Sequence, residues 1–158
     1  LVLDDGSSLT EFSAIAWWLA RTYPKRKLLP ESIAGEVRVL GIMNYAVHTL
    51  HTQGFARIFT TERFSPSSSD HESVKAQGRQ IIDQGFAIIN RELEGRDYVA
   101  DQFSIADAAL FYVEFWADRT GIPLPANCAA HYRLMLTRPA VRQVLAEEGY
   151  ASVLRQTS

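Results

Sequence analysis

Apolar residues recur at three- and four-residue intervals through most of this sequence, which is the spacing that gives a helix one apolar face. The pattern predicts helices over roughly residues 11–22, 31–62, 70–94, 104–120, 128–137 and 139–149. The sequence therefore predicts a mainly α protein, in which a bundle of about five helices makes up most of the chain.

The longest predicted helix, over 31–62, carries one continuous stripe at this spacing. Its members are Val37, Leu40, Gly41, Asn44, Val47, His51, Phe55 and Ile58. We expect this stripe to face the rest of the bundle, because an amphipathic helix buries its apolar side.

Capping and stop residues mark the ends of these helices. Thr10 is a suitable N-cap for the first helix, and Pro24 ends it because proline cannot continue the hydrogen bonding. Ser104 can cap the backbone N–H of Asp107 while the Asp107 carboxylate accepts from Ser104, which is a capping box. No histidine lies near this pair in the sequence, so we interpret the pair as a cap and not as a catalytic Ser–Asp pair.

The first ten residues have a different pattern, which predicts a β-hairpin. An apolar run from Leu1 to Leu3 is followed by the turn sequence DDG, and a second extended run reaches Thr10. Two strands alone are marginal in water, and every later segment is predicted to be helix. The hairpin is either a small unit docked on the helices or the edge of a larger sheet. We favour the second, with the rest of that sheet preceding Leu1.

Composition and charge narrow the class of protein. Of 158 residues, 47% are hydrophobic and 22% charged, as in an ordinary globular protein, and the net charge of −2 gives no basis for binding nucleic acid or an anionic membrane. No apolar run is long enough to span a bilayer. The single cysteine, Cys128, excludes an internal disulfide and suits a reducing compartment, so we expect a cytoplasmic protein.

Four motifs in order resemble the glutathione transferases. The opening segment, with LTE at 9–11, AI at 14–15 and WLA at 18–20, resembles the end of their thioredoxin-like domain. Further along, LLP at 28–30 resembles the family's linker, FSIADAALF its capping-box helix, and RPAVRQVLAEEG its closing segment. Asn44-Tyr45, followed by LH at 50–51 and GF at 54–55, resembles the bacterial beta class most.

The resemblance implies a domain division and an activity. Residues 1–23 would end a thioredoxin-like domain, 24–30 would be the linker, and 31–158 would form the all-α C-terminal domain. The implied enzyme is a homodimeric transferase of detoxification, which adds the glutathione thiolate to an electrophilic apolar substrate and uses no metal. The residue that activates the thiol is then expected upstream of Leu1.

The resemblance also assigns glutathione contacts at the start of the first helix. The main-chain N–H of Phe12 would bind the γ-glutamyl carboxylate, because unpaired N–H groups and the helix dipole favour an anion there. The Glu11 side chain would bind the ammonium group. Phe12 stands where the family often has Ser, which leaves only the backbone donor. The alternative is that Glu11 merely complements the helix dipole.

Three polar residues of the long helix complete the predicted site. By resemblance, His51 lies near glutathione and Asn44 reaches the site of the other subunit, and His48 is a further candidate on the same helix. Thr52 replaces a lysine that the beta-class pattern can carry. His48 and His51 share a helix face and could ligate a metal, but the sequence offers no third ligand at suitable spacing, so we expect no metal.

Aromatic residues could line the pocket for the second substrate, although core packing is their commoner role. The candidates for the pocket are Phe55, Phe59 and Phe64, whereas we expect Tyr112, Phe115 and Trp116 in the core or in the wall of the cleft.

Two other functions stay open at this stage. The chain could be a non-catalytic protein of the same fold that acts through protein–protein contacts, an alternative that Phe12 favours. It could also be a reductase or isomerase that uses glutathione as a cofactor, because one fold hosts several chemistries.

Overall fold

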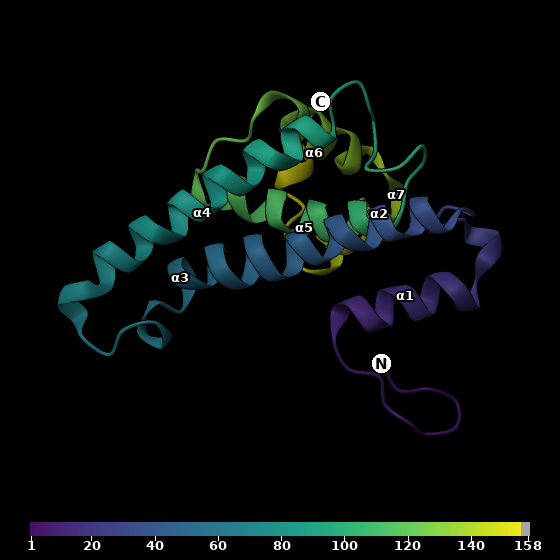
Figure 1. The fold of residues 1–158 in the computed structure, drawn as a ribbon, viewed down its shortest axis with the longest axis horizontal. Coiled ribbons are helices and arrows are strands. Elements are labelled where there is room, and N and C mark those ends of the chain that lie inside the picture. Colours follow the sequence, from purple (N-terminus) through teal and green to yellow (C-terminus); the bar gives the residue numbers. More distant parts are fainter. Residues whose placement is uncertain (156–158) are drawn as a thin grey trace.

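The computed structural model describes residues 1–155, and helices make up most of it (Figure 1). In chain order they are α1 (Phe12–Thr22), α2 (Ile33–Asn44), the π-helical segment η2 (Tyr45–Phe55), α3 (Ala56–Phe59), α4 (His71–Glu92), α5 (Ile105–Thr120), α6 (Ala126–Thr137) and α7 (Pro139–Glu147). Short 3-10 turns occur at Pro24–Arg26, Thr61–Arg63, Ser68–Asp70 and Val153–Arg155. The predicted mainly α class is confirmed. Within the described part of the chain, no helix is long and apolar enough to cross a membrane.

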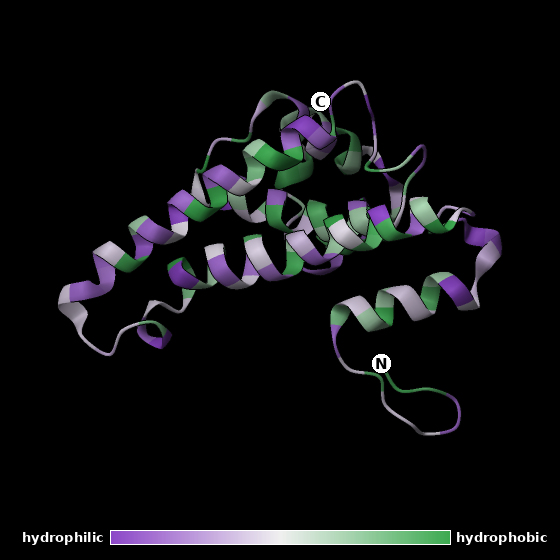
Figure 2. Cartoon of the chain, viewed as in Figure 1, coloured by the Kyte–Doolittle hydropathy of each residue, from purple (hydrophilic) through white to green (hydrophobic). Residues whose placement is uncertain are grey.

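The centre of the fold is one long helical rod. Because α2, η2 and α3 follow one another without a break, residues 33–59 form a single rod, close to the helix predicted over 31–62. Helix α4 runs back beside the rod in the opposite direction, and α5 packs against α2 and η2 (Figure 1). Figure 2 shows hydrophobic and hydrophilic residues alternating along α2 and α4, as expected for helices that bury one face.

The prediction that the apolar stripe of the long helix faces the bundle is wrong for the first part of the stripe. Val37 is 62% exposed, and Gly41 and Asn44 are exposed as well. The face that packs into the core is the neighbouring one. Its fully buried residues are Val39, Met43, Ala46, Leu50 and Phe55.

Glycines explain which face of the rod is buried. A Cβ on Gly78 of α4 would lie 2.8 Å from the carbonyl oxygen of Gly54, and one on Gly85 would lie 2.4 Å from Cδ2 of Leu50. Helix α4 therefore approaches the rod closely only along the side that carries Leu50 and Gly54. The spacing of apolar residues does not distinguish this side from the predicted one, whereas the close approach does.

The capping box at the start of α5 is confirmed. Oδ2 of Asp107 accepts hydrogen bonds from the backbone N–H of Ser104 at 2.7 Å and from its hydroxyl at 2.8 Å. Both halves of the box are formed, and the two residues are fully buried. Helices α6 and α7 then pack on α5 around a second core, which consists of Phe115, Tyr132, Leu136, Leu145 and Val153.

The predicted hairpin over residues 1–10 is not formed as a pair of strands. Among residues 1–155 the only strand-like pairing is one isolated antiparallel bridge between Val2 and Ser8. The loop is held by backbone hydrogen bonds, including one of 2.9 Å from Leu9 to the carbonyl of Leu1. Two short strands without sheet neighbours are marginal, which explains the loss of regular pairing. The apolar Leu1 and Val2 are exposed, in a loop away from the helices (Figure 2).

Helix α1 lies beside the bundle and packs against α2 and α5 (Figure 1). Its buried residues are Ala16 and Ala20, two small side chains four residues apart, so the helix presents a flat contact face. The predicted stop is confirmed, because α1 ends at Thr22 and Pro24 opens a short 3-10 turn.

Candidate functional site

The start of α1 has an unusual backbone. The helix begins at Phe12, and Glu11 occupies the N-cap position with φ 65° and ψ 125°. A positive φ in a residue with a Cβ is strained, and such strain concentrates at functional positions. Thr10 is therefore not the cap that the sequence predicts. Among residues 1–155 no side chain caps this end of the helix, so the first N–H groups of α1 are left for solvent or a ligand.

Asn44 lies next to this helix start. The Ser13 hydroxyl donates a hydrogen bond of 2.9 Å to Oδ1 of Asn44, which is the last residue of α2. Nδ1 of His48 is 3.1 Å from the carbonyl oxygen of the same asparagine. The structure thus brings together three of the five predicted residues: Glu11 and Phe12 at the start of α1, and Asn44 beside it. The contact of His48 is made within its own helix.

His51 lies further along the rod, in η2, where it meets an aromatic surface. Its ring contacts Tyr112 of α5 edge-on at 5.3 Å between centroids. Burial lowers the pKa of His51 below its usual 6.5, which favours the neutral imidazole at pH 7. Segments of π-helix often carry functional residues, and η2 carries both His48 and His51.

The contact between His51 and Tyr112 begins a row of aromatic rings. Tyr112 contacts Trp116 at 6.1 Å, and Trp116 contacts Phe59 at 4.9 Å. We call Tyr112, Trp116 and Phe59 the aromatic row. Tyr112 and Phe59 are exposed, whereas Phe55 is fully buried, so Phe55 is a core residue and not a pocket residue. The sequence signal for the row is the four-residue spacing of Tyr112 and Trp116 on α5.

A buried carboxylate that sequence reasoning missed holds α1 on α2. Oε1 of Glu36 accepts hydrogen bonds from Nε1 of Trp17 at 2.8 Å and from Nε of Arg21 at 3.2 Å. Arg21 also forms an ion pair with Oε2 of Glu36. This contact and the Ser13–Asn44 hydrogen bond together fix both halves of α1.

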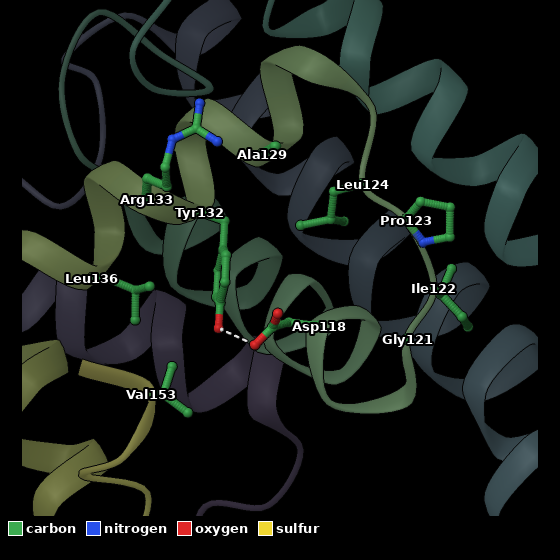
Figure 3. Close-up of a pocket in the computed structure, with 10 residues that line it drawn as sticks. All are labelled: Asp118, Gly121, Ile122, Pro123, Leu124, Ala129, Tyr132, Arg133, Leu136 and Val153. Carbon is green, nitrogen blue, oxygen red and sulfur yellow. Dashed lines mark hydrogen bonds between the residues drawn. The ribbon is translucent and has the colours of Figure 1, made fainter. Parts of the chain in front are cut away.

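Two cavities in the described part of the chain lie away from the predicted residues. One cavity of about 440 Å³ lies between α5, α6 and Val153, where the Tyr132 hydroxyl donates a hydrogen bond of 3.2 Å to Asp118 (Figure 3). The other, also about 440 Å³, lies at the linker around Lys27 and Gln102. Glu11 and Phe12 at the start of α1 are instead exposed, as are Tyr112 and Phe59 of the aromatic row, whereas Trp116 is partly buried. No cluster of three potential metal ligands occurs in residues 1–155.

Comparison with known proteins identifies the family. Residues 72–147 match the family model described as glutathione S-transferase, C-terminal domain. The glutathione S-transferase GstA of Escherichia coli O157:H7 is 34% identical over 156 residues, an alignment that covers 94% of this chain and 72% of GstA.

Solved structures agree with this assignment. The bacterial beta class glutathione S-transferase of Sphingomonas chungbukensis superposes with a TM-score of 0.79 at 28% identity, covering 95% of this chain and 73% of that protein. A sphingomonad glutathione S-transferase in complex with glutathione superposes with a TM-score of 0.78 at 30% identity, and the alignment covers 94% of this chain and 72% of that protein. This chain therefore belongs to the glutathione S-transferase family.

Proposed function

We propose that the protein is a glutathione transferase, which adds the thiolate of glutathione to an electrophilic carbon of an apolar substrate. The observation that carries the proposal is the start of α1, where an uncapped helix end follows the strained Glu11 and is tied to α2. Relatives named glutathione S-transferase and a relative bound to glutathione support it.

The γ-glutamyl end of glutathione would bind at the start of α1. The N–H of Phe12 would donate to the carboxylate, with the positive end of the helix dipole adding attraction. The Glu11 carboxylate would accept from the ammonium group. Both residues lie at the surface, with Phe12 48% exposed. The N–H of Phe12 has no partner within the helix, because it belongs to the first turn.

His51 and the aromatic row would contact the thiol end of glutathione and the second substrate. A neutral imidazole can both donate and accept a hydrogen bond, so His51 suits contact with glutathione or with its thiol. The row beside it offers an apolar surface for the second substrate, and Phe59 and Tyr112 expose their rings for that purpose. The thiolate is the nucleophile, so transfer also requires a group that stabilises it.

The exposed face of α2 supports a homodimer. Ile33 and Val37 are 80% and 62% exposed and lie four residues apart, so they share one face of the helix with the exposed Gly41. Large apolar side chains gathered on one face are typical of a protein interface. In such a dimer Asn44, at the end of the same helix, would lie near the partner's site while retaining its hydrogen bond with Ser13.

The domain division follows the same proposal. Residues 1–23 would end a thioredoxin-like domain, 24–30 would be the linker, and 31–158 would be the helical domain. The short turn at Pro24–Arg26, which separates α1 from α2, supports this division. The protein would act in detoxification in the cytoplasm.

The test measures glutathione binding and turnover separately. Isothermal titration with glutathione reports the α1 site, and an assay with an aryl halide as electrophile reports transfer. Saturable binding with glutathione-dependent conjugation is the expected result. A folded protein that neither binds glutathione nor conjugates it would instead support the non-catalytic interaction protein.

A further inference from the structure

Helices α5 and α6 enclose three ionisable side chains that the proposed glutathione site does not use. Asp107 and Glu114 come from α5, and His131 comes from α6. The two carboxylates are fully buried, and His131 is only 2% exposed. Burial of charged groups is costly unless they are paired, so the arrangement of these three decides whether the core is stable.

The imidazole of His131 lies between the two carboxylates. Its Nδ1 is 2.8 Å from Oε2 of Glu114, and its Nε2 is 3.2 Å from Oδ1 of Asp107. Asp107 and Glu114 are seven residues apart, which places both on one face of α5. Because each ring nitrogen faces a carboxylate oxygen, a doubly protonated imidazolium would donate to both.

The two carboxylates differ in the number of hydrogen bonds that they accept. Oδ1 of Asp107 also accepts from the backbone N–H of Val99 at 2.8 Å, and Oδ2 accepts from Ser104, so both oxygens of this carboxylate have hydrogen-bond donors besides His131. Glu114 has only His131, and its Oε1 is buried with no hydrogen-bond partner among the described residues. Burial raises the pKa of Glu114 to about 7, against the opposing effect of His131.

Two neighbouring titratable groups, Cys128 and Tyr132, add no charge near neutral pH. Burial raises the pKa of the Cys128 thiol to about 12, and its thiol points to the carbonyl of Phe86 in α4. Burial also raises the pKa of Tyr132, which is hydrogen-bonded to Asp118. The ring of Tyr98 meets His131 edge-on, and its hydroxyl accepts from the guanidinium of Arg138 at 3.2 Å.

We propose that Asp107, Glu114 and His131 form a buried proton-binding cluster that makes the packing of α6 on α5 depend on pH. With Glu114 protonated and His131 charged, the cluster carries no net charge. Loss of the Glu114 proton leaves one uncompensated negative charge in the core, and loss of a His131 proton leaves two. The packing is therefore strongest while the cluster keeps its protons, and it weakens as the pH rises.

The raised pKa values of His131 and Glu114 both predict that the folded state becomes less stable as the pH rises. Burial lowers the pKa of His131, but the hydrogen bonds to Asp107 and Glu114 outweigh burial and raise it to about 9, above the usual 6.5. The pKa of Glu114 is likewise above its usual 4.5. The folded protein then binds more protons than the unfolded chain between about pH 4.5 and 9. As the pH rises, Glu114 lowers the folding equilibrium constant between about pH 4.5 and 7, and His131 lowers it between about pH 6.5 and 9. The effect of each group is at most about tenfold per pH unit.

Urea unfolding from pH 5.5 to 9.5 tests the cluster. The comparison is the double variant Glu114→Leu with His131→Leu, which removes two of the three buried ionisable groups and leaves Asp107 with its hydrogen bonds from Val99 and Ser104. We expect the folding constant of the wild type, relative to the double variant, to fall at least about tenfold between pH 6 and 8.5. Parallel curves for the two proteins would overturn the proposal.

Two single variants make the test specific. Glu114→Gln copies the protonated carboxyl, so we expect stability near the wild type at pH 6 and above it at pH 9. If Glu114→Gln were less stable than the wild type by the same amount at pH 6 and at pH 9, Glu114 would be ionised at both pH values, which contradicts the proposal. As a control, Glu92→Gln removes a carboxylate from the exposed ion pair with Arg38. Its stability should change with pH in parallel with that of the wild type.

Nitrogen NMR of the imidazole gives a readout that does not require a variant of the cluster to be stable. The chain has four histidines, and the other three, His48, His51 and His71, are assigned by single His→Gln variants. At pH 7.5 we expect both ring nitrogens of His131 to be protonated, whereas an ordinary histidine is mostly neutral. A neutral His131 ring at this pH would overturn the proposal.

Discussion

The Ser13 hydroxyl and the Asn44 side chain form a hydrogen bond of 2.9 Å that joins the first turn of α1 to the last residue of α2. The contact matters because the N–H groups proposed to bind glutathione belong to that first turn. Asn44 therefore has a role within its own chain, in addition to the contact with the partner's site that the family resemblance implies.

Loss of this hydrogen bond should weaken glutathione binding. For Asn44→Ala we expect a several-fold higher Kd for glutathione, because the start of α1 is no longer held in one position. We also expect a loss of about 0.5–1.5 kcal/mol in the free energy of unfolding, the usual value of one hydrogen bond. Calorimetric titration and urea unfolding measure the two effects. Ser73→Ala, which removes a surface hydroxyl bonded to Asp70, is the matched control. An unchanged Kd in Asn44→Ala would contradict the prediction.

The backbone donor of Phe12 can be removed without breaking the helix. Proline is tolerated at the first position of a helix, where its missing N–H has no partner within the helix. Phe12→Pro should therefore fold but bind glutathione at least about tenfold more weakly, which is a loss of about 1.4 kcal/mol. Phe12→Ala keeps the N–H and should bind at least as well as the wild type. Equal binding by the two variants would mean that the side chain, and not the backbone, determines affinity.

Helix positions were predictable from sequence because periodicity and local capping determine them. The box of Ser104 and Asp107 involves residues three apart, so its chemistry is visible in the sequence alone. The strained φ of Glu11 was not visible, because it depends on how the preceding loop enters α1. The buried face of the rod was also missed, since the close approach of α4 at Gly78 involves residues far apart in sequence.

The same distinction explains which site residues sequence reasoning found. Glu11 and Phe12 were predicted because they adjoin one helix start. Glu36 was missed because its partners, Trp17 and Arg21, lie on another helix, and nothing in its own neighbourhood indicates them. His131 was missed as a partner of the α5 cap for the same reason.

Tyr112 should determine the protonation of His51. The pKa of His51 is lowered by burial alone, and Tyr112 is the ring that contacts it edge-on. We expect the pKa of His51 to lie below 6.5 in the wild type and to move up toward 6.5 in Tyr112→Ala, which admits water. A lowered pKa means that the folded protein gains stability from this group as the pH rises through the window up to 6.5, and loses it as the pH falls. Proton NMR of the imidazole C2–H resolves the titration. Tyr23→Ala, at an exposed position after α1, should leave the pKa of His51 unchanged.

Two glycines should respond in opposite ways to the same substitution. Gly78 lies where α4 meets the rod, and a Cβ there would sit 2.8 Å from the backbone oxygen of Gly54 and 2.9 Å from Cβ of Arg57. Backbone cannot move aside as a flexible side chain can, so α4 must shift away from the rod. Gly78→Ala should therefore lower the free energy of unfolding by about 1–3 kcal/mol, the range for an overpacked core.

Gly41 is the internal control for this comparison. It lies in α2 on the exposed face, where a Cβ would meet no atom within 4 Å. Alanine restricts the unfolded chain and favours the helix, so Gly41→Ala should raise the free energy of unfolding by about 0.5–1 kcal/mol in the monomer. Urea unfolding at low protein concentration measures both variants. If Gly78→Ala were as stable as the wild type, the close approach of α4 and the rod would not be what selects the buried face. If Gly41→Ala instead prevented dimer formation in sedimentation, while the monomer gained stability, the result would place the partner subunit against this face of α2.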